Sequence, residues 1–198
     1  MATIRDARDH DLPAIFEIYD FEVVHGTATF DTQPKAPGER LEWFDASPRD
    51  RYRVLVAEED GGVTGWARLY PWSPRKAYDR TAEDAVYVHR DHRGRGLGRA
   101  LLAALLEHAR RAGLGTIVAR IADGNPASLA LHASQGFERI GVMRRVGEKL
   151  GRILDVHLMQ VHLDAPGHGE IHGGPGTGGL TWGSCARGRC TSRPSAAR

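Results

Sequence analysis

The sequence predicts one α/β domain of the α+β kind, in which helices flank a mixed β-sheet. Its 198 residues suffice for one domain of ordinary size. Hydrophobic residues at 41% and charged residues at 26% are close to the averages of globular proteins, so the chain can bury a core. Strand and helix signals alternate in the order β-α-α-β-β-β-α-β-α-β-β, which is typical of a sheet covered by helices.

The first half of the chain begins with a short strand at 3–5. A helix over 10–22 follows, because Pro13 occupies a favoured place in its first turn and apolar residues recur at helical spacing. A second, shorter helix is expected over 38–46. The segments 53–58 and 63–70 then form a hairpin, since the Asp-Gly pair at 60–61 supplies the positive φ angles of a tight turn.

The second half alternates more regularly. A strand, a helix, a strand, a helix and two strands are expected over 85–89, 98–112, 116–121, 126–135, 137–147 and 154–163. The first of these helices repeats leucine at helical spacing, and Gly113 ends it. Gly136 ends the second helix in the same way.

The composition changes abruptly after Leu163. Residues 164–198 are rich in glycine and nearly free of aliphatic side chains, which predicts a disordered extension of a domain that spans 1–163. Both cysteines, Cys185 and Cys190, lie in this extension. With His168 and His172 they could be arranged as a zinc site, but their loose spacing among glycines favours no metal.

Charge and hydropathy exclude several classes of protein. Without the extension, the 27 basic residues become 23 and the 25 acidic residues also become 23, so the domain is neutral. A neutral domain gives no reason to expect nucleic-acid binding. No run approaches the ~18 apolar residues of a membrane span, and the first 20 residues lack the pattern of a signal peptide. We therefore expect a cytoplasmic protein without a membrane segment.

A glycine-rich loop joins the strand at 85–89 to the helix at 98–112. In Arg93-Gly94-Arg95-Gly96-Leu97-Gly98 the glycines let the backbone approach a ligand, and the N–H groups at the helix start favour an anion. This pattern predicts a phosphate cradle. Arg99 stands where the dinucleotide fingerprint needs glycine, and the Gly-Lys-Ser/Thr of a P-loop is absent. The alternative is a tight turn with no ligand.

The loop and several other segments resemble a known family. Arg93-x-x-Gly96-x-Gly98 is similar to the pyrophosphate loop of the acetyl-CoA-dependent N-acetyltransferases of the GNAT superfamily. The chain also resembles the phosphinothricin and methionine sulfoximine N-acetyltransferase branch, collinearly over about 2–163. The segments that carry this resemblance are TFDT at 29–32, PWSPRKAY at 71–78, TAEDAVYV at 81–88, GNPASLALH at 124–132, GF at 136–137 and VGEKLGRILD at 146–155.

The resemblance implies a GNAT-type, mostly antiparallel central sheet and acetyl-CoA as cosubstrate. The strand containing Val86, Tyr87 and Val88 would pair its backbone with the pantetheine arm, with one N–H near the thioester oxygen. Their alternative role is that of a buried apolar strand. The residues expected to bind acetyl-CoA are Val86, Tyr87, Val88, Arg93, Gly94, Arg95, Gly96, Leu97, Gly98, Asn125 and Ser128.

Two residues are expected to be catalytic. Glu83 matches the family's glutamate that takes a proton from the substrate ammonium, directly or through water, and it needs a raised pKa to do so near neutrality. The alternative is a solvated acid at the strand end, like its neighbour Asp84. His132 lies where this branch carries a histidine that could donate a proton to the departing thiolate or help to activate the amine. A packed, hydrogen-bonded histidine is its alternative interpretation.

The acceptor is expected to be a small amino acid of the glutamate-analogue type. The resemblance places Phe30 in the wall of its pocket, and Arg75, Lys76 and Tyr78 in a loop whose cations could bind its carboxylate or phosphinate. A solvated basic loop is the alternative. Three residues depart from the branch. Asp20 replaces an asparagine, Glu148 replaces a phenylalanine or glutamine, and Ile153 replaces a tryptophan. The resemblance assigns the segment that holds the last two to the acceptor pocket and the subunit contact.

The resemblance further implies a homodimer. Direct transfer in a ternary complex is expected because no cysteine in 1–163 could carry an acyl group. Other acceptors remain open, namely another small amine, an aminoglycoside or a protein N-terminus. A catalytically idle acyl-CoA-binding module is a second alternative.

Overall fold

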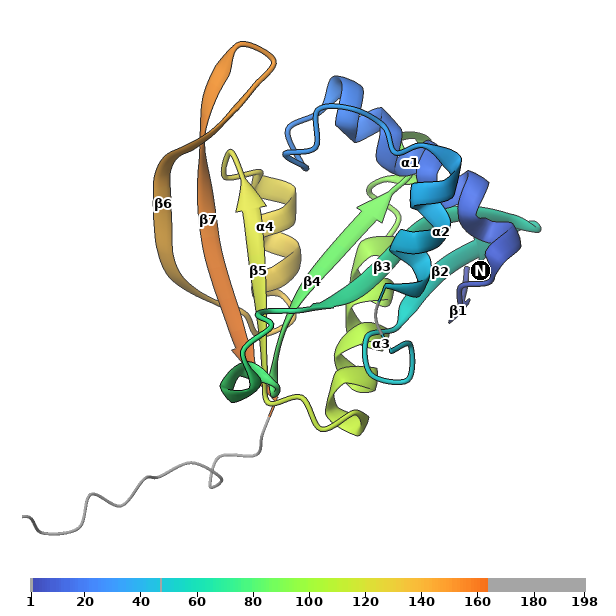
Figure 1. Ribbon diagram of the computed structural model, residues 1–198. Coiled ribbons are helices and arrows are strands. Elements are labelled where there is room, and N and C mark those ends of the chain that lie inside the picture. Colours follow the sequence, from blue (N-terminus) through green and yellow to red (C-terminus); the bar gives the residue numbers. More distant parts are fainter. Residues whose placement is uncertain (1, 47, 164–198) are drawn as a thin grey trace, which may run out of the picture. The chain divides into compact units, whose positions relative to one another are not determined.

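Seven strands form one mixed sheet in the computed structural model, which describes residues 2–46 and 48–163. Their spatial order is β1-β2-β3-β4-β5-β7-β6, and only β4 and β5 run parallel (Figure 1). The strands are β1 (Thr3–Asp6), β2 (Val54–Glu59), β3 (Gly62–Pro71), β4 (Thr81–Val88), β5 (Thr116–Ala122), β6 (Glu138–Lys149) and β7 (Arg152–His162). The predicted fold class and element order are confirmed. The predicted extension 164–198, with its histidines and cysteines, lies outside the described residues.

Helices cover both faces of the sheet. They are α1 (Leu12–His25), α2 (Pro37–Asp45), α3 (Leu97–Arg111) and α4 (Pro126–Ala133), with 3-10 turns η1 (Asp9–Asp11), η2 (Lys76–Tyr78) and η3 (Arg90–His92). Val54 and Val56 of β2 pack with α1 and α2, whereas the intervening Leu55 packs with the leucines of α3. This alternation builds two cores on opposite faces. In the described part of the chain, no helix is long and apolar enough to span a membrane.

Local signals place most elements close to their predicted ranges. The hairpin between β2 and β3 turns at Asp60 and Gly61, whose φ angles of 51° and 80° are those that the Asp-Gly pair predicts. The prediction was wrong for β4, which begins at Thr81 and not at 85. Its first residues lack apolar alternation, but they are paired on both sides, with β3 and with β5. Tertiary pairing therefore overrides the weak local signal.

A fork in the sheet between β4 and β5 positions the site. The two strands pair only over Thr81–Glu83 and Thr116–Val118, and then diverge. β5 instead continues its pairing with β7 along its whole length, as far as Ala122. Figure 1 shows the resulting gap between the carboxyl ends of β4 and β5. The backbone edge of β4 beyond Glu83 therefore faces the gap without a partner strand.

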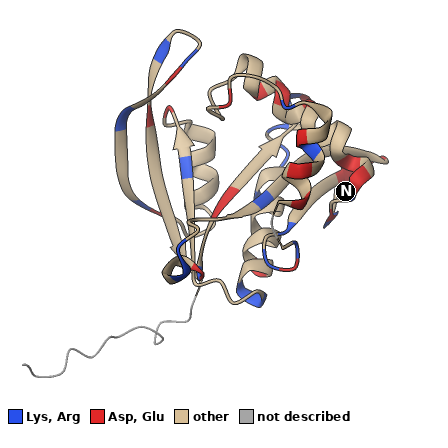
Figure 2. Cartoon of the chain, in the orientation of Figure 1, with Lys and Arg blue, Asp and Glu red and all other residues tan. Residues whose placement is uncertain are grey.

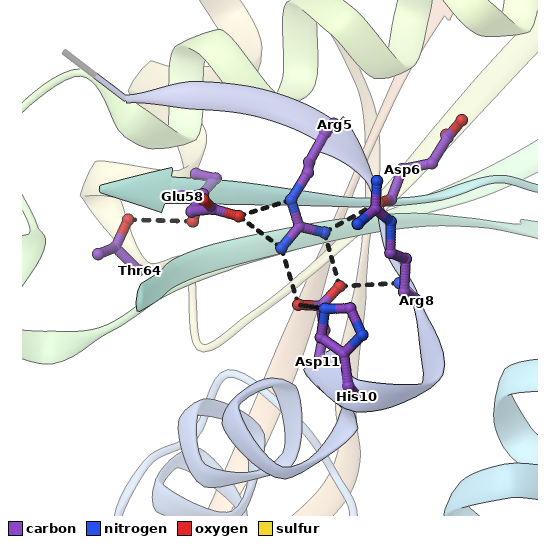
Figure 3. Close-up of polar contacts among 8 residues, drawn as sticks. Arg5, Asp6, Arg8, His10, Asp11, Glu58 and Thr64 are labelled. Atoms are coloured by element: carbon purple, nitrogen blue, oxygen red, sulfur yellow. Dashed lines mark hydrogen bonds and ion pairs between the residues drawn. The ribbon is translucent and has the colours of Figure 1, made fainter. Parts of the chain in front are cut away.

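A partly buried ion-pair network ties the first helix to the sheet (Figure 3). Arg5 of β1 donates to both carboxylate oxygens of Asp11, at 2.7 and 2.9 Å, and to Glu58 of β2 at 2.6 Å. Asp11 also accepts from the backbone N–H of Arg8 at 2.8 Å. The hydrogen bond from Arg5 lowers the pKa of Asp11 against the opposing effect of burial. The start of α1 is thereby fixed to β1 and β2.

Candidate active site

A cavity of about 1130 Å³ lies along the fork between β4 and β5. It extends from the glycine-rich loop at the start of α3, along β4, to Glu83, and α1, α4, β5 and β7 contribute to its walls. Ligand pockets commonly measure roughly 300 to 1000 Å³, so this one suits a large or elongated ligand. Thirteen of the seventeen predicted site residues line it: Phe30, Glu83, Val86, Tyr87, Val88, Arg93, Gly94, Gly96, Leu97, Gly98, Asn125, Ser128 and His132.

The glycine-rich loop has the geometry of a backbone cradle. Gly94 and Gly96 adopt φ angles of 75° and 81°, which side chains with a Cβ rarely adopt. Gly96 caps α3, and its carbonyl accepts the first helical hydrogen bond, from Ala100 at 3.0 Å. The N–H groups at positions 97–99 therefore have no partner within the helix. These N–H groups form the positive end of the helix dipole, where an anion is stabilised.

The arginine side chains of the loop are engaged with the protein. Arg93 donates to Glu22 at 2.5 Å and to the carbonyl of Val88 at 3.2 Å. Arg95 lies outside the cavity lining, and its guanidinium contacts Glu59 at 3.3 Å. The main chain and not these side chains is thus the part of the loop best placed to meet an anion.

The strand β4 presents free backbone groups to the cavity. Trp72 N–H donates to the carbonyl of Thr81, and His89 N–H donates to that of Thr64, so odd-numbered residues of β4 direct their polar backbone groups toward β3. Even-numbered residues therefore face β5 and, beyond Glu83, the open fork. Val86 is the central even-numbered residue along this open edge. The Tyr87 side chain points to the α1 face, where its ring stacks on Trp66 at 4.7 Å.

Glu83 lies at the vertex of the fork, on the last residue of β4 that pairs with β5. It stands opposite Tyr70 of β3 and Val118 of β5, and its side chain is 17% exposed. Burial raises the pKa of Glu83, while a hydrogen bond and the charge of Arg120, at 2.6 Å, oppose the rise. A half-buried carboxylate at the end of a cavity can exchange a proton with a bound ligand.

His132 is a buried residue of α4 held between two acceptors. Its Nδ1 lies 2.7 Å from the carbonyl of Ser128, and its Nε2 lies 3.0 Å from the carboxylate of Asp84. A carbonyl and a carboxylate both act as hydrogen-bond acceptors, so this environment favours the protonated ring, in which both nitrogens donate. Burial lowers the pKa of His132, but the hydrogen bond and charge of Asp84 outweigh it and leave the pKa raised.

Asp84 corrects one expectation from the sequence. It is not a solvated acid at a strand end, because it lies inside β4 and its side chain is 1% exposed. Glu83 and Asp84 are adjacent and so point to opposite faces of the sheet. Asp84 therefore meets α4, and Glu83 does not.

Asn125 and Ser128 lie where α4 begins. The side-chain oxygen of Asn125 accepts from the N–H groups of Ala127 and Ser128 at 3.1 and 3.2 Å, which caps the helix. Both residues line the cavity. Their predicted contact with a ligand stays a prediction, and the helix cap is a structural role that the pattern Asn-Pro already favours.

The predicted acceptor residues separate into two groups. Phe30 lines the cavity and lies so close to Gly147 of β6 that a Cβ there would clash with its ring. Arg75, Lys76 and Tyr78, in and before η2, are exposed and lie outside the cavity lining of this chain. The structure therefore does not bring these three residues to Glu83, and their role stays a prediction.

None of the three departures from the resembling branch lines the cavity. Asp20 of α1 pairs with Arg40 of α2 at 2.8 Å. Glu148 and Ile153 stand opposite each other in the hairpin of β6 and β7, and the Ile153 side chain is exposed.

Sequence reasoning missed the polar partners of both predicted catalytic residues. Arg120 interrupts the apolar strand Thr116–Ala122, and a charged residue inside an otherwise apolar strand is the signal that could have found it. Asp84 follows Glu83 in the polar first half of β4, where no local pattern indicates burial. Tyr19 of α1 was missed as well. It lines the cavity and donates to Asp31 at 2.9 Å.

Comparisons with known proteins agree with this geometry. Residues 12–137 match the acetyltransferase (GNAT) family. An L-methionine sulfoximine/L-methionine sulfone acetyltransferase of Pseudomonas paraeruginosa is 46% identical over 164 residues, covering 82% of this chain and 95% of that protein. A phosphinothricin N-acetyltransferase of Alcaligenes faecalis is 42% identical over 164 residues, covering 82% and 83%. The structure of a putative acetyltransferase from Salmonella typhimurium with its cofactor acetyl-CoA has a TM-score of 0.81 at 42% identity, covering 86% and 99%.

Proposed function

The chain belongs to the acetyltransferase (GNAT) family, and from this membership we propose that it transfers the acetyl group of acetyl-CoA to the amine of a small amino-acid-like acceptor. Acceptors of the methionine sulfoximine and phosphinothricin type are those named for the two relatives. One observation carries the proposal: a single cavity joins a backbone phosphate cradle to a half-buried carboxylate. The first end suits the cosubstrate and the second suits an amine.

The residues at the cradle end fit acetyl-CoA. The N–H groups at 97–99 would hold its phosphates, and the free backbone edge of β4 at Val86 would pair with its pantetheine arm as an added strand does. When bound, acetyl-CoA supplies an activated acetyl thioester. The N–H of Val86 faces the fork and would donate to the oxygen on which negative charge develops.

Glu83 would act on the acceptor. An α-ammonium group must lose a proton before it can attack, and Glu83 is the carboxylate at the fork vertex that has a raised pKa. The proton passes to Glu83 directly or through one water. Since residues 1–163 contain no cysteine, we propose direct transfer to the amine without a thiol-bound intermediate of the protein.

His132 would serve the departing sulfur. The acceptors Asp84 and Ser128 favour its protonated ring, which is unsuited to accept a proton from the amine. We propose that it places a positive charge, and a proton available for transfer, beside the cavity where the thiolate forms. This role refines the expectation from the sequence, which left open whether His132 assists the amine or the thiolate.

The function is tested by thiol release from acetyl-CoA with a panel of acceptors: methionine sulfoximine, methionine sulfone, phosphinothricin, ordinary amino acids, an aminoglycoside, polyamines and an N-terminal peptide. We expect kcat/KM to be highest for one of the first three. Turnover confined to polyamines, the aminoglycoside or the peptide would reject the acceptor class. Tight acetyl-CoA binding with no turnover of any amine would identify an idle binding module instead.

We also propose that the protein is a homodimer. The hairpin of β6 and β7, at one edge of the sheet, exposes five large apolar side chains: Ile140, Val142, Val146, Leu150 and Ile153. An apolar surface of this kind on an edge strand favours association. Sedimentation equilibrium should give twice the 21.7 kDa mass of one chain, and Ile153→Glu should lower it. A single-chain mass at micromolar concentration would refute the dimer.

The cytoplasmic location expected from the sequence stays a prediction.

A further inference from the structure

Arg120 is a charged residue in a strand that is otherwise apolar. Its neighbours in β5, Ala119 and Ile121, are 2% and 4% exposed, whereas half of the Arg120 side chain (52%) remains accessible. The side chain points to the face that carries Glu83, and it lines the cavity. Its Nε donates to Glu83 at 2.6 Å. In Figure 2 the basic position on β5 lies across the fork from the acidic part of β4.

The positive charges of the cavity are divided between its two ends. Among the described residues that line it, the only lysine or arginine side chains are Arg93, Arg99 and Arg120. Arg93 and Arg99 flank the glycine-rich loop, and Arg93 is already paired with Glu22. Arg120 is therefore the single guanidinium at the Glu83 end. An anion that accompanies the amine would meet this group first.

We infer that Arg120 and Glu83 together bind a zwitterionic α-amino acid, with Arg120 taking the acceptor's carboxylate and Glu83 facing its ammonium group. The inference deepens the proposed function and rests on it. The two charges of an α-amino acid are separated by one carbon atom, which suits a directly adjacent arginine and glutamate. The ion pair would exchange its internal partners for the two ends of the acceptor, and a guanidinium can bind a carboxylate through two parallel hydrogen bonds.

The exchange would also link acceptor choice to the chemistry. While Arg120 holds Glu83, its charge favours the ionised carboxylate and so weakens Glu83 as a base. When the acceptor's carboxylate draws Arg120 away, burial alone acts on Glu83 and raises its proton affinity. An amine without a carboxylate cannot draw Arg120 away, so the ion pair between Arg120 and Glu83 stays intact. Arg120 would thus select α-amino acids over simple amines.

The test compares an amino acid with its amide in four proteins. Methionine sulfone and methionine sulfone carboxamide differ only in the carboxylate, and KM and kcat are measured for both with wild type, Arg120→Ala, Arg120→Lys and Arg111→Ala. Arg111 is the matched control, because it pairs with Glu107 on α3 and lies outside the cavity lining. We expect Arg120→Ala to raise the KM of the acid roughly 10- to 100-fold and to leave that of the amide within about threefold. Arg120→Lys should recover part of the loss, and Arg111→Ala should match wild type.

The outcomes separate this inference from the proposed function. Equal losses for acid and amide in Arg120→Ala would mean that Arg120 only supports Glu83, and an unchanged KM for the acid would also overturn the inference. Wild-type protein that acetylates neither these two acceptors nor any other amine would reject the proposed function itself. Circular dichroism melting of each variant identifies a loss caused by unfolding, in which case Arg120→Gln replaces the alanine variant.

Discussion

Replacing Glu83 by glutamine is expected to lower kcat by roughly 10² to 10⁴, while the Kd of acetyl-CoA stays within about twofold of wild type. Glutamine keeps the shape of the side chain and can still contact Arg120, but it cannot accept a proton. The cradle at the start of α3 is at the other end of the cavity, so the cosubstrate loses no contact. Steady-state kinetics and calorimetry measure the two quantities.

Glu107→Gln is the matched control for this change. Glu107 is also a glutamate paired with an arginine, Arg111, but it is exposed on α3 and does not line the cavity. Its substitution should leave kcat unchanged. A Glu83→Gln enzyme as fast as the control would remove Glu83 from the mechanism.

The pH dependence of kcat/KM should report Glu83 and His132 together. Glu83 must be ionised to accept a proton, so activity should fall as pH decreases through its raised pKa. His132 must stay protonated, so activity should fall again as pH rises through the pKa that Asp84 raises. The expected profile is bell-shaped. Glu83→Gln should remove the acidic limb, and His132→Asn the basic limb; a basic limb that persists in His132→Asn would exclude its proposed role.

The second large effect is expected from Gly96→Val, which should weaken acetyl-CoA binding at least tenfold. Gly96 has φ 81°, where a β-branched residue is strained by roughly 1 to 3 kcal/mol, and relief of the strain would move the N–H groups of the cradle. No atom lies within 4 Å of a Cβ built there, so the new side chain would project into the open space that the phosphates must enter. Calorimetry with acetyl-CoA measures the loss.

Two control variants test whether the loss of acetyl-CoA binding comes from the cradle, and not from backbone strain alone or from charge. Gly61→Val places valine at φ 80° in the hairpin turn, equally free of contacts but outside the cavity lining, so it should lower the melting temperature and spare binding. Arg95→Ala removes an exposed charge that contacts Glu59, and should cost about 1 kcal/mol or less. A larger loss of binding in Arg95→Ala than in Gly96→Val would mean that charge, and not the backbone, holds the phosphates.

The element order and the cosubstrate loop were predictable because their signals are local. The Asp-Gly turn, the leucine spacing of α3 and the glycines at 94 and 96 each encode a backbone geometry within a few residues. The start of β4 was predicted four residues late for the opposite reason. Thr81 to Glu83 form a strand because β3 and β5 pair with them from both sides, and no local pattern records that pairing.

The sequence by itself determined the family, the alternation of strands and helices, and the identity of Glu83 and His132 as candidate catalytic residues. Only the tertiary structure decided which groups these residues meet. Arg120 reaches Glu83 from 37 positions away, and Asp84 reaches His132 from 48. The parallel register between β4 and β5 fixes the first pair, and the alternation of side chains along β4 turns Asp84 toward α4. A carboxylate's proton affinity depends on burial and neighbouring charge, and both arise only when distant strands are brought together.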